Sequence, residues 1–218
     1  MSDWLMWQLA DSSFPTGGFV HSGGLEAAAQ AGLIAAIGLE AVIAQALASV
    51  AALGLPYVAA SLRDGDAFVL LDRRHDAQLS NHVANRASRA QGQALIATAA
   101  ATFAAPELIA LKATLRRDGL PGHLAPCFGR VAASLALDPR SARRLFLFQH
   151  LRGLVSSAVR LGVVGPLAAQ AMQARLAARG EELAAREPPD VGDAATTAPL
   201  VDLVHAQHDR LYSRLFNT

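Results

Sequence analysis

Apolar residues recur along most of the chain at steps of three and four positions, the period of an α-helix that buries one face. The pattern is clearest in residues 140–161. One stripe of this segment is apolar and another is polar: Leu147, Leu151, Leu154, Ala158 and Leu161 against Arg152, Ser156 and Arg160. Sustained alternation of apolar and polar residues, the pattern of a strand, is absent from the sequence. The sequence therefore predicts an all-α fold, a single domain of about ten helices with no sheet.

Glycine and proline mark the expected ends of these helices. We expect breaks at Gly54, Gly65, Pro106 and Pro139, and across residues 162–166. The helical period then covers these ranges: 4–10, 25–31, 39–53, 55–62, 67–75, 80–103, 107–117, 123–137, 140–161, 167–186 and 200–215.

One stretch has the composition of a linker. Residues 187–199 (EPPDVGDAATTAP) combine proline, glycine, aspartate and threonine with almost no large apolar side chain. We therefore expect an all-α domain over residues 1–186, a flexible linker over 187–199, and a C-terminal helix and tail over 200–218. This last part either belongs to the same domain or docks to a partner.

Residues 41–62 carry no charge, and 22 residues suffice in length to cross a bilayer. The stretch is largely alanine, which contributes little transfer free energy, and it contains Gln45 and Pro56. A helix buried inside the protein, or partly against a second subunit, is the favoured interpretation.

Composition narrows the class of protein. The 218 residues are 52% hydrophobic and 17% charged, with a net charge of +1, which argues against disorder and against a nucleic-acid binder. The single cysteine, Cys127, excludes an intrachain disulfide and is expected to be a packed thiol. Residues 1–7 carry Asp3 and no basic stretch, so a signal peptide is not expected and a cytoplasmic protein is.

The most distinctive local feature is the glycine-rich run from Ala10 to Glu26. A phosphate-binding loop needs lysine followed by serine or threonine, but Gly24 and Leu25 occupy those positions, so nucleotide binding is rejected. A structural turn, with Ser22 capping the next helix, and a recognition surface both stay open.

Metal chemistry has one candidate, the group Asp202, His205, His208 and Asp209 near the C-terminus. On a helix these side chains lie on adjacent turns, which could supply two ligands but no complete site. The alternative is an exposed polar face. A metal-dependent hydrolase that uses His205 and His208 with nearby carboxylates is the alternative function, although no HExxH or GxSxG motif is present.

A second polar block lies in residues 85–93, where Arg86, Arg89 and Gln93 share one helical face. Arginines are favoured at protein interfaces, so this face is either a contact surface or a solvated one. Gly92 within a helix costs about 1 kcal/mol relative to alanine, which indicates close packing at this position.

Four blocks, in order along nearly the whole chain, resemble the UreF family of urease accessory proteins. Leu9 to Glu26 (LADSSFPTGGFVHSGGLE) is similar to the family's long N-terminal signature, LADSxxPxGGFxHSxGLE. The other three blocks are RASRAQG at 86–92, AVRLG at 158–162 and LYSRLF at 211–216.

The resemblance implies an all-α, non-enzymatic, cytosolic chaperone that forms a homodimer. It implies binding to UreD (UreH in some organisms) and to the GTPase UreG, for nickel delivery to the urease apoprotein when GTP is hydrolysed. Nickel and GTP would act through these partners, and the chain would hold no cofactor of its own. No nucleic acid or membrane is implied as a partner.

By position, the resemblance implies that the signature shapes the surface where the GTPase docks and that the C-terminal tail orders against UreD. The residues expected to bind partners are Asp11, Ser12, Pro15, Gly17, Gly18, Phe19, His21, Ser22, Gly24, Glu26, Arg86, Gln91, Arg160, Tyr212, Arg214 and Phe216. The ending Asn217-Thr218 departs from the Arg and Ser of many members, so a terminal charged contact is not expected.

Overall fold

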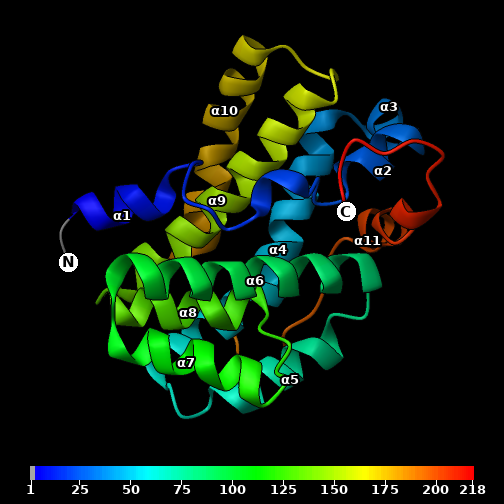
Figure 1. Ribbon diagram of the computed structural model, residues 1–218. Helices are drawn as coiled ribbons and strands as arrows, with labels where there is room; N and C mark the ends of the chain where they lie inside the picture. The colour runs from blue at the N-terminus through cyan, green and yellow to red at the C-terminus, as the bar shows by residue number, and fades with distance from the viewer. Residues whose placement is uncertain (1–2) are drawn as a thin grey trace.

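The computed structural model describes residues 3–218 and shows a bundle of helices (Figure 1). This part of the chain contains eleven α-helices, two 3-10 helices and no strand, which confirms the predicted all-α class. The elements are α1 (Asp3–Ala10), η1 (Gly18–Val20), α2 (Leu25–Gln30), α3 (Leu33–Ile37), α4 (Leu39–Arg63), α5 (Phe68–Gln78), α6 (His82–Phe103), α7 (Pro106–Arg117), α8 (Leu124–Ser134), α9 (Pro139–Arg160), α10 (Pro166–Ala185), α11 (Pro199–His205) and η2 (His208–Arg210).

Helix α4 is the central helix of the core and packs against α8, α9 and α10. It is long and apolar enough to cross a membrane, but 61% of its most apolar window is buried inside the protein. Val42, Ile43, Leu47 and Tyr57 are among its buried side chains. The stretch that raised the question of a membrane span is therefore a core helix, as the favoured interpretation predicted.

Helices α6 and α8 cross in close contact, and Gly92 is the reason that they can. A Cβ atom at Gly92 would lie 2.2 Å from the carbonyl oxygen of Gly122 and 2.6 Å from the amide nitrogen of Leu124. Any side chain here would collide with main-chain atoms, which cannot rotate away. The close packing predicted from this glycine is confirmed.

The start of α8 is buried, so its free amide groups need protein acceptors. Asp72 of α5 accepts hydrogen bonds from the amides of Gly122 and His123, at 2.8 and 2.7 Å. The hydroxyl of Ser88 accepts from the amide of Leu124 at 3.2 Å. Burial raises the pKa of the Asp72 carboxyl, an effect that these two amides oppose. Two side chains, the buried Asp72 of α5 and the partly buried Ser88 of α6, thus cap α8.

Beside this cap, Ser88, His123 and Asp76 form a chain of hydrogen bonds with His123 in the middle. The His123 ring lies 3.1 Å from the Ser88 hydroxyl through Nδ1 and 2.9 Å from Asp76 Oδ1 through Nε2. A hydrolase would also need amide donors for an oxyanion. Those of Gly122 and Leu124 already bind Asp72 and Ser88, so the arrangement acts as a helix cap.

Two expected helix boundaries are wrong. Gly54 is not a break, because α4 runs through it and through Pro56 without interruption. A Cβ at Gly54 would lie 3.0 Å from the Phe146 ring, so this glycine serves helix packing rather than helix termination. The expected helix over 200–215 ends at His205, and the short α3 was not anticipated.

The stretch 187–198 has no helix. Ala194 and Ala198 are buried in the core cluster, and the side-chain amide of Gln78 donates to the carbonyl of Val191 at 3.1 Å. This stretch leads into α11, which packs against α2 and brings the C-terminus beside it (Figure 1). The N-terminal signature and the C-terminal residues are thereby brought together.

Candidate functional site at the N-terminal signature and the C-terminal segment

The signature segment, Leu9 to Glu26, crosses the end of α9 as an irregular loop that includes η1. Its first turn is held by Asp11, whose Oδ1 accepts from the amide and the hydroxyl of Ser13 at 2.7 and 2.6 Å. These hydrogen bonds lower the pKa of Asp11. Near its end Gly24 adopts φ +88°, and a Cβ there would lie 2.8 Å from the His205 ring. The glycine therefore allows both the left-handed turn and the contact with α11.

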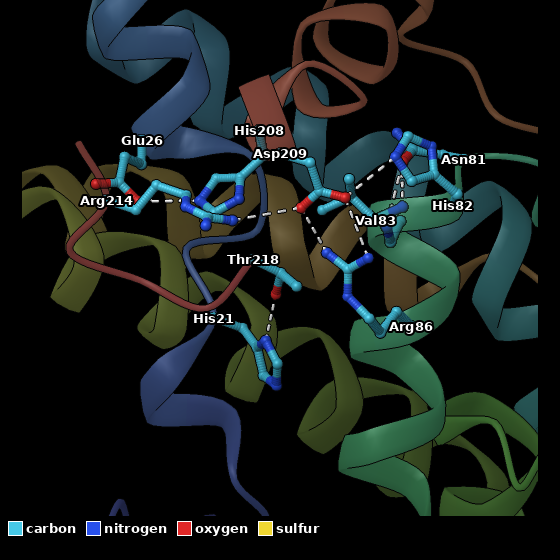
Figure 2. A network of polar contacts seen from close by, with 11 residues as sticks. His21, Glu26, Asn81, His82, Val83, Arg86, His208, Asp209, Arg214 and Thr218 are labelled. Atoms are coloured by element: carbon cyan, nitrogen blue, oxygen red, sulfur yellow. Dashed lines mark hydrogen bonds and ion pairs between the residues drawn. The ribbon is translucent and has the colours of Figure 1, made fainter. Parts of the chain in front are cut away.

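The C-terminal segment, which we define as residues 208–218, folds back onto the signature segment. Glu26 is its main anchor and is only 2% exposed. Oε1 of Glu26 accepts from the amide of Leu215 at 2.6 Å, and Oε2 accepts from the amide of Phe216 at 3.1 Å. Nε2 of His208 donates to the same Oε2 at 3.0 Å, as Figure 2 shows. One carboxylate thus collects three donors from the C-terminal segment.

Main-chain hydrogen bonds continue this attachment. The amide of Asn217 donates to the carbonyl of Val20 at 2.9 Å, and the amide of Ser22 donates to the carbonyl of Thr218 at 2.6 Å. The side chains of His21 and Thr218 also form a hydrogen bond (Figure 2). The last residues therefore lie alongside the signature loop.

Arg160 of α9 joins the two segments through aromatic rings. Its guanidinium lies 3.7 Å from the centroid of the Phe19 ring and 4.2 Å from that of Phe216, and it also donates to the carbonyl of Phe19. Phe19 is 68% exposed, whereas Phe216 is 3% exposed. Cation–π contacts of this kind favour arginine over lysine.

Asp209 links the C-terminal segment to α6. Arg86 donates to both of its carboxylate oxygens, at 3.1 and 2.7 Å, while His82 and Arg214 lie 3.4 and 3.7 Å away (Figure 2). The hydrogen bonds from Arg86 are the main reason that the pKa of Asp209 is lowered. This bidentate pair is partly exposed, so it contributes specificity of position more than stability.

The predicted exposed histidine face is wrong. His205 and His208 are 9% and 0% exposed, because α11 and η2 pack their histidines against α2 and the signature loop. Asp209 points away toward Arg86. Within residues 3–218 no group of three or more histidine, cysteine or carboxylate side chains is arranged to hold a metal ion, so the hydrolase alternative has no assembled centre.

Ser22 is not the cap of the helix that follows it. Gly24 occupies the N-cap of α2 without a side-chain hydrogen bond, and the Ser22 carbonyl, rather than its hydroxyl, accepts from the amide of Leu25 at 3.2 Å. The Ser22 hydroxyl is buried with no hydrogen-bond partner.

The expected partner-binding residues divide into two groups. Phe19, Glu26, Arg86, Arg160, Arg214 and Phe216 meet in the contacts just described, and Gly24 and His21 border them. Gln91 is close to Gly18, where a Cβ would lie 3.3 Å from its Oε1. Asp11, Ser12, Pro15, Gly17 and Tyr212 are exposed around this assembly. Asn217 and Thr218, which the sequence reasoning set aside as atypical, hold the signature through their main chain.

The attachment of the C-terminal segment is expected to weaken in acid. Burial lowers the pKa of His205 to about 4, and the positive charges of His208, His21, His82 and Arg86 act in the same direction. A histidine with a depressed folded-state pKa contributes stability above pH 6.5 that is lost as the pH falls toward 4. At pH 5 the loss is about 2 kcal/mol, from about 1.36 kcal/mol per unit.

Hydrogen exchange of the amides in α11 and the C-terminal segment, measured at pH 7 and pH 5 and corrected for intrinsic rates, tests this effect. The excess opening at pH 5 should become much smaller in His205→Gln, which cannot titrate in this range, and His21, whose pKa burial also lowers, accounts for the remainder. An unchanged pH dependence in that variant would contradict the assignment to His205.

Comparison with known proteins agrees with this architecture. A UreF family model matches residues 35–177. Urease accessory protein F of Arabidopsis thaliana is 41% identical over 219 residues, covering 98% of this chain and 91% of that protein. Urease accessory protein F of Oryza sativa subsp. indica is 37% identical over 224 residues, covering 99% and 85%. Urease accessory protein UreF of Arthrobacter sp. (strain FB24) is 30% identical over 218 residues, covering 96% and 94%.

The fold and the site define an all-α protein whose two terminal segments build one polar surface. The range that the family model matches begins after the signature and ends before the C-terminal segment. The relatives extend the likeness to nearly the whole chain. The chain belongs to the UreF family of urease accessory proteins.

Proposed function

We propose that this chain is a non-enzymatic scaffold of urease maturation in the cytoplasm. In this proposal it binds UreD (UreH in some organisms) and the GTPase UreG, and it regulates GTP-dependent delivery of nickel to the urease apoprotein. The observation that carries the proposal is the surface built by the signature and C-terminal segments, which are 182 residues apart at the contact between Glu26 and His208. A shaped, polar surface of this kind suits protein recognition.

In this proposal, partner proteins bind the nickel that is delivered and the GTP that is hydrolysed. The glycine-rich loop has no lysine to neutralise phosphate; of the two candidate histidines, His205 packs against Gly24 and His208 binds Glu26. A homodimer is part of the proposal, and exposed apolar side chains such as Trp7, Phe148 and Leu167 support it.

Reconstitution of urease activation tests the proposal directly. Apo-urease, nickel, GTP, UreG and UreD are combined with and without this chain, and urease activity is measured. We expect activation to depend on the chain, and the chain alone to show no turnover of GTP. Equal activation in both mixtures would remove the proposed function.

A substitution in the signature tests where the GTPase docks. Gly18→Arg places a long charged side chain beside Gln91 and should weaken UreG binding at least about tenfold. Gly165→Arg is the matched control, because this exposed glycine lies at φ −75° with no heavy atom near its Cβ position. Wild-type affinity in Gly18→Arg, measured by isothermal titration, would contradict docking at the signature.

A further inference from the structure

The signature segment binds the C-terminal segment mainly through the main-chain atoms of the C-terminal segment. We call the binding surface the cradle, and it consists of the Val20 carbonyl, the Ser22 amide, the Glu26 carboxylate and the aromatic-faced Arg160. Four of the hydrogen bonds described above join the cradle to main-chain atoms of residues 215–218. Many proteins bind peptides through main-chain hydrogen bonds and one side-chain anchor.

The occupant makes only one deep apolar contact. Phe216 is buried under Arg160, whereas Leu215 is 56% exposed and Tyr212 is fully exposed. A terminal segment with so little buried apolar surface opens at much lower free energy than the helical core. The segment can therefore leave the cradle while the rest of the protein stays folded.

An empty cradle would lack main-chain hydrogen-bond donors for the Glu26 carboxylate. Glu26 is buried, and it loses the amide donors of Leu215 and Phe216 when residues 214–218 leave, which leaves it with His208 alone. A carboxylate in such surroundings is best satisfied by another pair of adjacent main-chain amides. The Arg160 face, with Phe19 on its other side, offers a place for an aromatic side chain.

We propose that the cradle is a peptide-binding site that the free chain fills with its own Arg214–Thr218. An extended segment of a partner protein, with an aromatic side chain in the place of Phe216, displaces this occupant. The inference rests on the proposed function only for which maturation partner supplies the segment. The C-terminal residues of the chain thus decide whether the cradle is open to a partner.

The test uses the full chain with one substitution near its end. Phe216→Ala removes the aromatic anchor, and Leu215→Ala is the matched control because Leu215 is largely exposed. The probe is a fluorescein-labelled peptide with the sequence of residues 211–218, LYSRLFNT, followed by fluorescence anisotropy. The peptide should bind Phe216→Ala at least tenfold more tightly than it binds the parent chain or Leu215→Ala. A peptide with alanine in the place of phenylalanine should bind none of them.

One further variant and one further measurement complete the test. Adding Glu26→Gln to Phe216→Ala should abolish peptide binding, and retained binding would contradict the cradle. Equal affinity for the parent and Phe216→Ala, or no binding to Phe216→Ala at millimolar peptide, overturns the proposal. Hydrogen exchange of the parent chain gives an independent check: the amides of residues 215–216 should exchange without global unfolding, and exchange only by global unfolding would refute displacement. None of these readouts involves urease activation, so they fail or succeed separately from the reconstitution.

Discussion

Gly92→Ala is expected to destabilise the protein by about 3 kcal/mol, although alanine is the better helix former. The added Cβ would lie 2.2 Å from the Gly122 carbonyl and 2.6 Å from main-chain atoms of residues 123 and 124. Helix α6 must then move away from α8, which opens the contact where Asp72 and Ser88 accept hydrogen bonds from the start of α8. Overpacking against main chain cannot be relieved by a rotamer change.

Gly180→Ala is the matched control for this substitution. Gly180 also lies within a helix, α10, but a Cβ there has no heavy atom within 4 Å. The same chemical change should therefore stabilise the protein by about 1 kcal/mol through helix propensity. Urea unfolding followed by circular dichroism at 222 nm measures both variants. Similar free energies of unfolding for the two variants would contradict the close crossing of α6 and α8.

Much of the fold could be predicted because helical period and breakers are local signals. The apolar stripe of 140–161 became the buried side of α9, where Leu147, Leu151 and Leu154 are all less than 7% exposed. Gly54 failed as a breaker because glycine has two uses, ending helices and letting them approach. Only the position of Phe146, more than 90 residues away in sequence, decides between them.

The C-terminal segment shows the other limit of sequence reasoning. The apolar and charged pattern of 200–215 suits a helix, but α11 ends at His205 and is followed by the short 3-10 helix η2 and by irregular residues. Glu26 selects this conformation by accepting from the amides of residues 215 and 216. Main-chain amides are present at every position, so they leave no mark in the sequence at either end of the contact.

The signature was visible from sequence, but the reasons for several of its residues were not. Gly24 was expected to belong to a turn or a recognition surface, and it proves to face His205 as well. Cys127, expected to be a packed thiol, is fully buried. His205 and His208 were placed on an exposed face because histidine is polar, whereas both are buried and His208 has Glu26 as its hydrogen-bond partner.

Asp72→Ala should cost about 3 kcal/mol, because it removes the acceptor for two buried amides at the start of α8. Asp72 has no exposed surface, and water cannot take over the hydrogen bonds of Gly122 and His123 without a cavity opening. Asp72→Asn keeps one oxygen acceptor and almost the same volume. The free energy of unfolding of Asp72→Asn should lie between that of the parent chain and that of Asp72→Ala.

Asp138→Ala is the control that separates the loss of a helix cap from the effect of burying that cap. Asp138 also caps a helix, accepting from the amide of Ser141 at 3.0 Å, but at the exposed start of α9. Its loss should cost about 1 kcal/mol, since water replaces the carboxylate. The difference between the two alanine variants therefore measures the cost of stranding amides inside the protein. If denaturant unfolding gave equal losses, the buried cap of α8 would have water access, and the tight packing of α5, α6 and α8 would be contradicted.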